Sequence, residues 1–202
     1  CSDGIFSYEN TSNVLIKSTT PFHELKVFKA SGKSFPRLAA FISLQKVIIA
    51  TLDPYPKILF KFFPNDEGLA TPNPKENLFY PCGNFLYTDE VQKLLFFAIG
   101  WDQDIILYTI SKNYQFSKVG QLKVNCRILQ IHPISQDLLY IFSHKQSILL
   151  KIEAKPNKIS TRIAVMTSKD FDLPDIEGMI TVNKEFSGFK NSIVFLKDKH
   201  IF

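Results

Sequence analysis

Short runs of apolar residues, four to eight long and rich in Ile, Val, Phe and Tyr, recur along the whole chain between clusters of Asp, Asn, Pro, Gly and Ser. Runs of this length, bounded by turn-forming residues, are typical of β-strands. Several runs come in pairs separated by a tight polar turn, which predicts hairpins. The pattern therefore predicts an all-β protein. The four clearest pairs are 46–52 with 57–63, 93–99 with 104–110, 137–143 with 147–153, and 191–196 with 200–202.

The second strand of each hairpin begins with an isoleucine just after the turn. The opening residues, CSDGIFSYEN, follow the same pattern, because Ile5 comes after the turn at residues 2–4. A period of about 40 to 50 residues with four short strands per unit is typical of a β-propeller. We expect the hairpins to be the second and third strands of successive blades, with approximate periods 5–57, 58–104, 105–147 and 148–200. The recurring isoleucines are Ile5, Ile58, Ile105, Ile148 and Ile201, at separations of 53, 47, 43 and 53 residues.

The unit beginning at Arg127 predicts all four strands of a blade, at 127–133, 137–143, 147–153 and 160–166, and the preceding unit ends in a fourth strand at 116–124. First strands are almost continuously apolar, as expected where both faces of a sheet are covered. Residues 21–45 carry one more apolar run than a blade requires, and 36–45 also fit a short helix with proline near its first turn. Residues 64–81, with four prolines, predict a long surface loop between blades.

The segment ILQIHPISQDLLYIFSHKQSILLKIE resembles the first three strands of a WD-repeat blade, and CSDGIFSYEN resembles the turn between the second and third strands of that family. The Gly-His and Trp-Asp pairs of the family are missing from their places, and the single Trp-Asp pair, Trp101-Asp102, lies in a predicted turn. The resemblance implies a WD-like propeller with about four blades of a ring of about six to eight. The chain is then expected to be a fragment of a larger propeller. The alternative architecture is a β-sandwich, for which the regular spacing gives no reason.

Composition and charge narrow the class of protein. The 202 residues are 45% hydrophobic, which is enough for a substantial core, and no apolar run is long enough for a membrane span. The net charge of +5 comes from scattered basic residues, so nucleic acid is not the favoured partner. Three cysteines without metal-like spacing favour an intracellular compartment, cytoplasm or nucleus. The glycosylation sequon at Asn10 points the other way, to an extracellular protein.

The sequence contains no zinc helix, nucleophile elbow, phosphate loop, Cys-x-x-Cys pair or calcium loop. We therefore predict no enzyme activity, no cofactor and no metal. The histidines are interpreted as structural or exposed, the turn aspartates as turn formers, and the phenylalanines of the strands as core. The histidines are His23, His132, His144 and His200, and the turn aspartates are Asp3, Asp53, Asp102 and Asp198. The strand phenylalanines are Phe60, Phe62, Phe63, Phe96 and Phe97.

Candidate binding residues lie in the predicted turns and loops. Trp101 follows Gly100 in a predicted turn, where a large aromatic side chain is either an exposed binding anchor or folds back over the blade edge. Tyr55 lies in the turn DPYP, and Tyr80 lies beside Pro81 at the end of the proline-rich loop. The full set of candidates is Trp101, Asp102, Tyr55, Pro72, Pro74 and Tyr80.

The favoured function is a non-enzymatic scaffold for protein–protein interaction within a multi-subunit assembly, as the WD-like resemblance implies. One alternative is the ectodomain of a receptor or channel auxiliary subunit, which glycosylation of Asn10 or a disulfide between Cys82 and Cys126 would indicate. A second is a scaffold for nucleic-acid processing, which a steep salt dependence of binding would indicate. The least favoured is an enzyme with a site in the central channel, because Arg127, Gly178 and Asn84 stand where acidic or histidine side chains would be needed.

Overall fold

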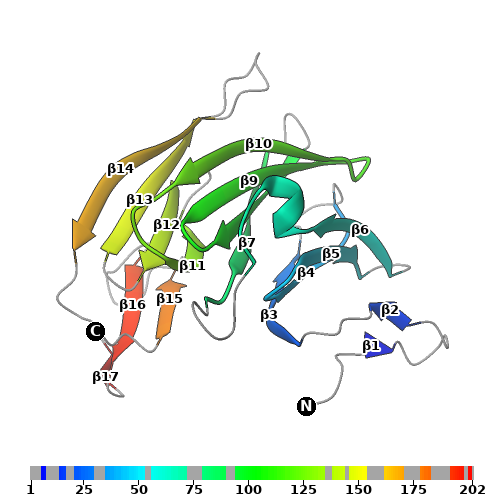
Figure 1. The fold of residues 1–202 in the computed structure, drawn as a ribbon, viewed down its shortest axis with the longest axis horizontal. Coiled ribbons are helices and arrows are strands. Elements are labelled where there is room, and N and C mark those ends of the chain that lie inside the picture. The colour runs from blue at the N-terminus through cyan, green and yellow to red at the C-terminus, as the bar shows by residue number, and fades with distance from the viewer. Residues whose placement is uncertain are drawn as a thin grey trace.

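The structure is a computed structural model that describes residues 6–7, 14–16, 21–29, 35–52, 56–71, 79–89, 94–134, 138–143, 146–153, 162–170, 178–182, 192–197 and 200–201 (Figure 1). These residues form seventeen β-strands and one short 3-10 helix, η1 (Pro64–Glu67). All strand pairings among them are antiparallel. The prediction of an all-β protein is confirmed.

Three sheets of four strands each follow one another along the chain, and in each sheet the spatial order of the strands is their order in the sequence. The first sheet contains β3 (Phe22–Phe28), β4 (Leu38–Ser43), β5 (Val47–Thr51) and β6 (Lys57–Phe62). The second contains β7 (Cys82–Asp89), β8 (Leu94–Trp101), β9 (Asp104–Ser111) and β10 (Phe116–Lys123). The third contains β11 (Ile128–Pro133), β12 (Leu138–Ser143), β13 (Gln146–Glu153) and β14 (Arg162–Asp170).

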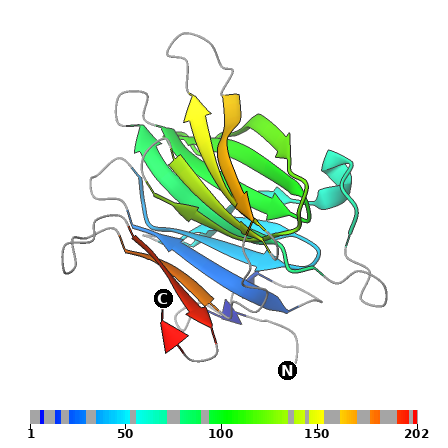
Figure 2. The same cartoon turned by 90° about the vertical axis from the view of Figure 1, so that its left-hand side faces the viewer.

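Two smaller sheets flank these three. Strands β1 (Phe6–Ser7) and β2 (Val14–Ile16) form a pair near the N-terminus. Strands β15 (Gly178–Val182), β16 (Ser192–Lys197) and β17 (His200–Ile201) form a sheet near the C-terminus. Figure 2 shows this last sheet apart from the third one.

The second sheet lies between the first and third sheets, and the apolar residues on both of its faces are buried. On one face Phe97 belongs to a cluster with Ile42 of the first sheet, and on the other Phe96 belongs to a cluster with Ile131 of the third. Strands β8 and β9 are almost continuously apolar because neither face meets water. Strand β10, at the outer edge, carries exposed polar residues.

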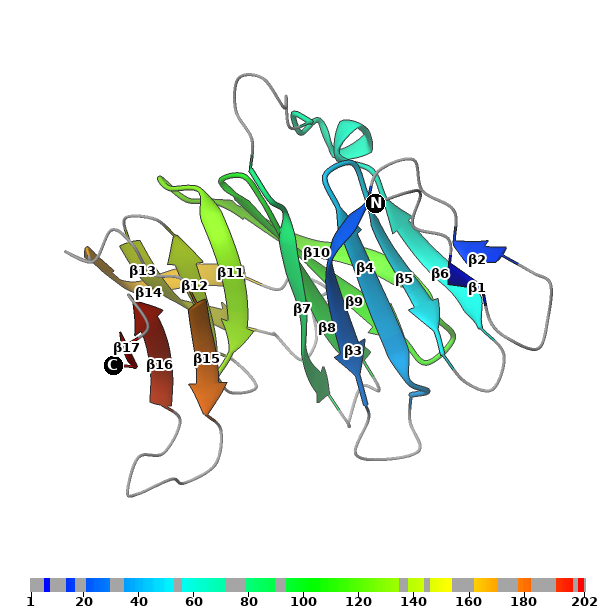
Figure 3. The ribbon, with the colours of Figure 1, turned by 90° about the horizontal axis from the view of Figure 1, so that it is seen from below.

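The first strands of successive sheets are neighbours. Strand β3 contacts β7, β7 contacts β11, and β11 contacts β15, and Figure 3 shows these four strands following one another across the molecule. The fourth strands β10 and β14 also meet, and β2 contacts β6. The three four-stranded sheets and the C-terminal sheet thus follow one another in chain order, with first strand beside first strand.

Several expectations about local structure are settled. Residues 36–45 contain strand β4 and not a helix. The predicted fourth strands at 116–124 and 160–166 are found as β10 and β14. The hairpin at 46–63 is formed, but as the third and fourth strands of its sheet, so Ile58 does not correspond to Ile105 and Ile148. The period boundaries at 57/58, 104/105 and 147/148 fall within β6, β9 and β13.

The connection between the first and second sheets runs where the loop at 64–81 was predicted, but it is not purely a surface loop. It begins with η1, which ends at Gly68 in the left-handed conformation, with φ of 69°. Pro64 and Phe79 within it are buried. Part of this connection therefore packs against the core.

Candidate functional site

Trp101 is not the exposed turn residue that one interpretation of the sequence predicted. It is the last residue of β8, paired with Asp104, and its side chain is only 1% exposed. Because alternate residues of a strand point to opposite faces, the indole lies on the face covered by the first sheet, with ring centroids 5.4 Å from Phe62 and 5.7 Å from Phe79. Its Nε1 donates a 2.8 Å hydrogen bond to the carbonyl oxygen of Ala70. Trp101 is thus a core residue that fixes the connecting segment.

Asp102 bonds to two residues at the start of the third sheet, Arg127 and Ile128. It adopts φ of 53° in the β8–β9 turn, a conformation that Asp tolerates better than most residues. Its carboxylate accepts a 3.1 Å bond from Nε of Arg127, and its carbonyl oxygen accepts a 2.7 Å bond from the amide of Ile128. The positive φ fits a turn residue, but the carboxylate bonds to a side chain 25 residues away and not, as predicted, to a nearby backbone amide.

Among the predicted binding residues that the structure describes, Tyr80 is the most exposed. Its side chain is 54% exposed, and its ring lies edge-on to the ring of His23, with centroids 5.3 Å apart. Phe63, which the apolar pattern predicts to be a core residue, is 41% exposed. It comes after the end of β6 and precedes η1. Tyr55, Pro72 and Pro74 lie outside the described residues.

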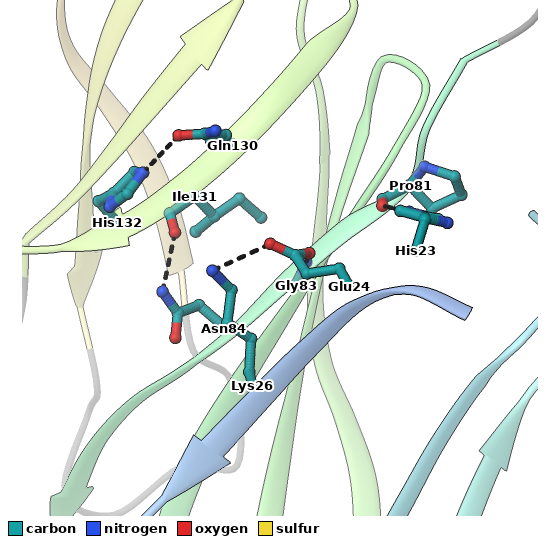
Figure 4. A network of polar contacts seen from close by, with 9 residues as sticks. All are labelled: His23, Glu24, Lys26, Pro81, Gly83, Asn84, Gln130, Ile131 and His132. Carbon is teal, nitrogen blue, oxygen red and sulfur yellow. Dashed lines mark hydrogen bonds and ion pairs between the residues drawn. The ribbon is translucent and has the colours of Figure 1, made fainter. Parts of the chain in front are cut away.

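Polar side chains on the first strands form a further candidate site, which we call the first-strand polar row (Figure 4). The row links β3 to β7 and β7 to β11. Its members are His23, Glu24 and Lys26 on β3, Asn84 on β7, and Gln130 and His132 on β11.

Each link in the row joins a side chain to the backbone of the following strand. The Glu24 carboxylate accepts a 3.2 Å bond from the amide of Gly83 and forms a 2.9 Å ion pair with Lys26. The Asn84 amide donates a 3.0 Å bond to the carbonyl oxygen of Ile131. These bonds connect strands that share no sheet ladder, so the row ties each sheet to the next.

Histidines occupy the two ends of the row. His23 donates from Nε2 to the carbonyl oxygen of Pro81 at 2.7 Å, and His132 donates from Nε2 to Oε1 of Gln130 at 2.9 Å. Burial lowers the pKa of His132 to about 4, and the positive charge of Lys26 acts in the same direction. His132 is therefore neutral at pH 7.

Sequence reasoning missed most of this row, although a signal for it was present. Glu24 and Lys26 interrupt the apolar pattern of FHELKVF, Asn84 interrupts CGNFLY, and Gln130 and His132 interrupt ILQIHP. A polar residue within a first strand that is otherwise apolar needs a hydrogen-bond partner. The neighbouring sheet supplies that partner here.

The connecting segment is held against the second sheet by a second polar network. Tyr108 of β9 donates a 2.8 Å bond to Oε1 of Glu67, and Lys118 of β10 lies 2.5 Å from Oε2 of the same carboxylate. The hydrogen bond from Lys118 lowers the pKa of Glu67, whereas burial raises the pKa of Tyr108. Together with the bond from Trp101 to Ala70, this network holds the segment 64–71 against the second sheet at two points, Glu67 and Ala70.

Cys82 and Cys126 are free and buried in the same apolar cluster, so the disulfide that would have indicated an ectodomain is not formed. Burial raises the pKa of the Cys82 thiol, with the nearby charge of Glu24 acting in the same direction. Asn10 lies outside the described residues. In the part of the chain that the structure describes, no three His, Cys, Asp or Glu side chains gather in a group that could hold a metal ion.

No helix among the described residues has the length and apolar character needed to cross a membrane. Comparison of the sequence with known protein families and with curated proteins finds no match.

Proposed function

We propose that this chain is a non-enzymatic protein–protein interaction scaffold, built from consecutive blades of a WD-like β-propeller. The order of strands within each four-stranded sheet supports the propeller, since a blade is an antiparallel sheet of four strands taken in sequence. The contacts between first strands β3, β7, β11 and β15 support it further, because first strands are the ones that meet around a central axis.

The observation that carries the scaffold proposal is that the side chains of the first-strand polar row bond to one another and to the backbone of neighbouring strands. In a propeller, polar side chains near the axis are the natural place for a catalytic or metal site. Here the Glu24 carboxylate is engaged by Lys26 and by the amide of Gly83, and Asn84 is engaged by the backbone of β11. His132 is neutral and bound to Gln130. The polar groups therefore serve to hold the sheets together, which leaves the outer surface as the functional part.

The contact surface we favour is the connection between the first and second sheets, flanked by the exposed aromatic rings of Phe63 and Tyr80. Aromatic side chains are frequent binding anchors. The described part of the connection is fixed by the bonds from Trp101 to Ala70 and from Tyr108 to Glu67. A surface held in place before binding loses little conformational entropy when a partner docks. The candidate prolines Pro72 and Pro74 belong to the same connection.

The experiment is affinity capture of partners on the purified chain, with the captured proteins quantified by mass spectrometry for each variant. We expect Phe63→Ala and Tyr80→Ala each to reduce capture of a specific partner by about tenfold, which corresponds to about 1.4 kcal/mol. Tyr114→Ala is the matched control, because Tyr114 is also an exposed aromatic residue, 39% exposed, but lies in the β9–β10 turn. Equal capture by all variants, with unchanged thermal unfolding, would contradict the proposed surface.

A further inference from the structure

Residues 64–71 follow the first sheet in the chain and lie on the second sheet, and we call them the strap. Within the described part of the chain, no backbone hydrogen bond joins the strap to a strand. Its backbone bonds are internal, since the amide of Gly68 donates to the carbonyl oxygen of Asn65 at 3.2 Å and the amide of Leu69 donates to that of Pro64 at 2.8 Å. Side-chain contacts therefore attach the strap to the sheets.

Three polar bonds join the strap to the second sheet. Trp101 donates to the carbonyl oxygen of Ala70, Tyr108 donates to Oε1 of Glu67, and Lys118 donates to Oε2 of the same carboxylate. Tyr108 and Lys118 are direct cross-strand partners on β9 and β10, so their side chains share one face of the sheet. Glu67 thus receives two of the three bonds, one of them an ion pair.

Lys118 is held in place for its contact with Glu67. Its Nζ also donates to Oε1 of Gln121 at 2.8 Å, and Nε2 of Gln121 donates to Oδ1 of Asp104 at 2.9 Å. Hydrogen bonds between charged groups are stronger than those between neutral groups. Glu67 is therefore the main polar attachment of the strap.

The strap has the features of a segment that unfolds separately from the sheets. Local unfolding occurs where few apolar groups are buried and much of the backbone is exposed. Pro64 is buried, and Leu69 is partly buried against the apolar cluster that contains Trp101. A single turn of 3-10 helix is not stable by itself in water, so η1 keeps its internal bonds only while the strap is docked. The exposed residues of the strap are Asn65, Asp66, Gly68, Ala70 and Thr71.

We propose that the strap opens as one cooperative unit while the three four-stranded sheets stay folded, and that Glu67 is the latch, the residue whose bonds favour the closed state. Opening leaves the indole N–H of Trp101 and the hydroxyl of Tyr108 without their acceptors. It also releases η1, which begins directly after the exposed Phe63. The surface beside Phe63 therefore has two states, and breaking the bonds of Glu67 shifts the balance toward the open one. The proposal goes beyond the scaffold function, because it concerns the chain without a partner.

The opening is tested by hydrogen exchange of the purified chain, measured by NMR at urea concentrations below the unfolding transition. The probes are the amides of Gly68 and Leu69 and the indole N–H of Trp101, the single tryptophan. After correction for intrinsic rates, we expect all three to exchange at least about tenfold faster than the slowest amides of β8 and β9. Their exchange should depend only weakly on urea, because opening the strap exposes little surface. Equal protection and equal urea dependence for strap and sheets would overturn the proposal.

The latch is tested with two variants of Glu67. Glu67→Ala removes both bonds, whereas Glu67→Gln removes the ion pair and leaves an oxygen that can accept from Tyr108. We expect Glu67→Ala to speed exchange of the Gly68 and Leu69 amides by about tenfold or more, and Glu67→Gln to speed it by a smaller factor. The indole N–H of Trp101 should speed up by the same factor as the two amides in each variant. The bonds of Glu67 go to Tyr108 and Lys118, so this effect at Trp101 requires that the strap opens as one unit.

Asp66→Asn is the matched control, because Asp66 is the neighbouring carboxylate of the strap and is exposed. It should leave the three exchange rates close to those of the wild type. Faster exchange at Gly68 and Leu69 without a change at Trp101 would show two independent openings and would overturn the proposal. An effect of Asp66→Asn as large as that of Glu67→Ala would overturn the assignment of Glu67 as the latch.

Discussion

Replacing Gly100 with alanine tests how closely the second and third sheets are packed. Gly100 lies on β8 opposite Cys82 of β7. An added Cβ would lie 2.7 Å from Sγ of Cys82, 2.8 Å from Cγ2 of Ile128 and 3.3 Å from Cδ1 of Ile131. All three neighbours are buried in one cluster, so none can turn into solvent to make room. The substitution must therefore push the two sheets apart or force strained side-chain conformations.

The cost follows from these distances. Overpacking a buried site by one methyl group costs about 1–3 kcal/mol. The alanine recovers about 0.4–1 kcal/mol by restricting the unfolded chain, which leaves a net loss of about 1.3 kcal/mol at the middle of both ranges and of at most about 2.6 kcal/mol. With an m-value of about 2–3 kcal/mol/M in urea, the unfolding midpoint should fall by about 0.3–1 M. The assay is urea unfolding followed by the fluorescence of Trp101, the single tryptophan of the chain, which is buried in the fold.

A double variant separates the steric cause from other effects. Cys82→Ala removes the sulfur that the new Cβ would meet, so Gly100→Ala should cost less in that background, with a coupling energy of about 1 kcal/mol. An unchanged midpoint in the single variant would refute the close packing at this point. A coupling energy of zero would show that Cys82 does not cause the loss.

Three further results are expected. Lowering the pH from 6.5 to 4 should reduce the free energy of unfolding, because burial lowers the pKa of His132 to about 4 and the unfolded chain takes up the proton first. The expected loss is about 1–2 kcal/mol after allowance for solvent screening. His132→Gln should therefore reduce the difference between the urea midpoints at pH 7 and pH 5. Tyr108→Phe should cost about 1 kcal/mol by removing the bond to Glu67, and a thermal melt equal to wild type would contradict that role. Asn84→Leu should cost about 1–2 kcal/mol by leaving the Ile131 carbonyl without its donor, whereas Gln121→Leu, at an exposed polar contact with Asp104, should leave the urea midpoint within error.

The strands were predictable because they depend on local sequence. Runs such as DIILYTI and DLLYIFS carry β-branched and aromatic residues between turn formers, and they became β9 and β12. The spacing of isoleucines was a weaker guide. Ile58 follows a turn as Ile105 does, but it belongs to a fourth strand, because residues 21–45 supply two strands before the hairpin that contains it. Local pattern alone does not say how many strands precede a hairpin in its sheet.

The candidate site was less predictable because exposure is decided by contacts distant in sequence. Trp101 followed a glycine and preceded an aspartate, which resembles an exposed turn. The β8–β9 pairing continues for one residue more and brings the indole under the connecting segment, where Ala70 accepts its hydrogen bond. Phe63 stood at the end of an apolar run and was assigned to the core, but the strand ends at Phe62, one residue before it. Both errors concern a single residue at the end of a strand.

The most direct test of the scaffold proposal is the dissociation constant between the purified chain and a protein partner that it captures. It should be measured by isothermal titration for the wild type, for the Phe63→Ala/Tyr80→Ala double variant and for the Tyr114→Ala control. The proposal predicts that the double variant binds at least tenfold more weakly than wild type, while the control binds as the wild type does. Equal affinity for all three proteins, each with a wild-type unfolding transition, would contradict it.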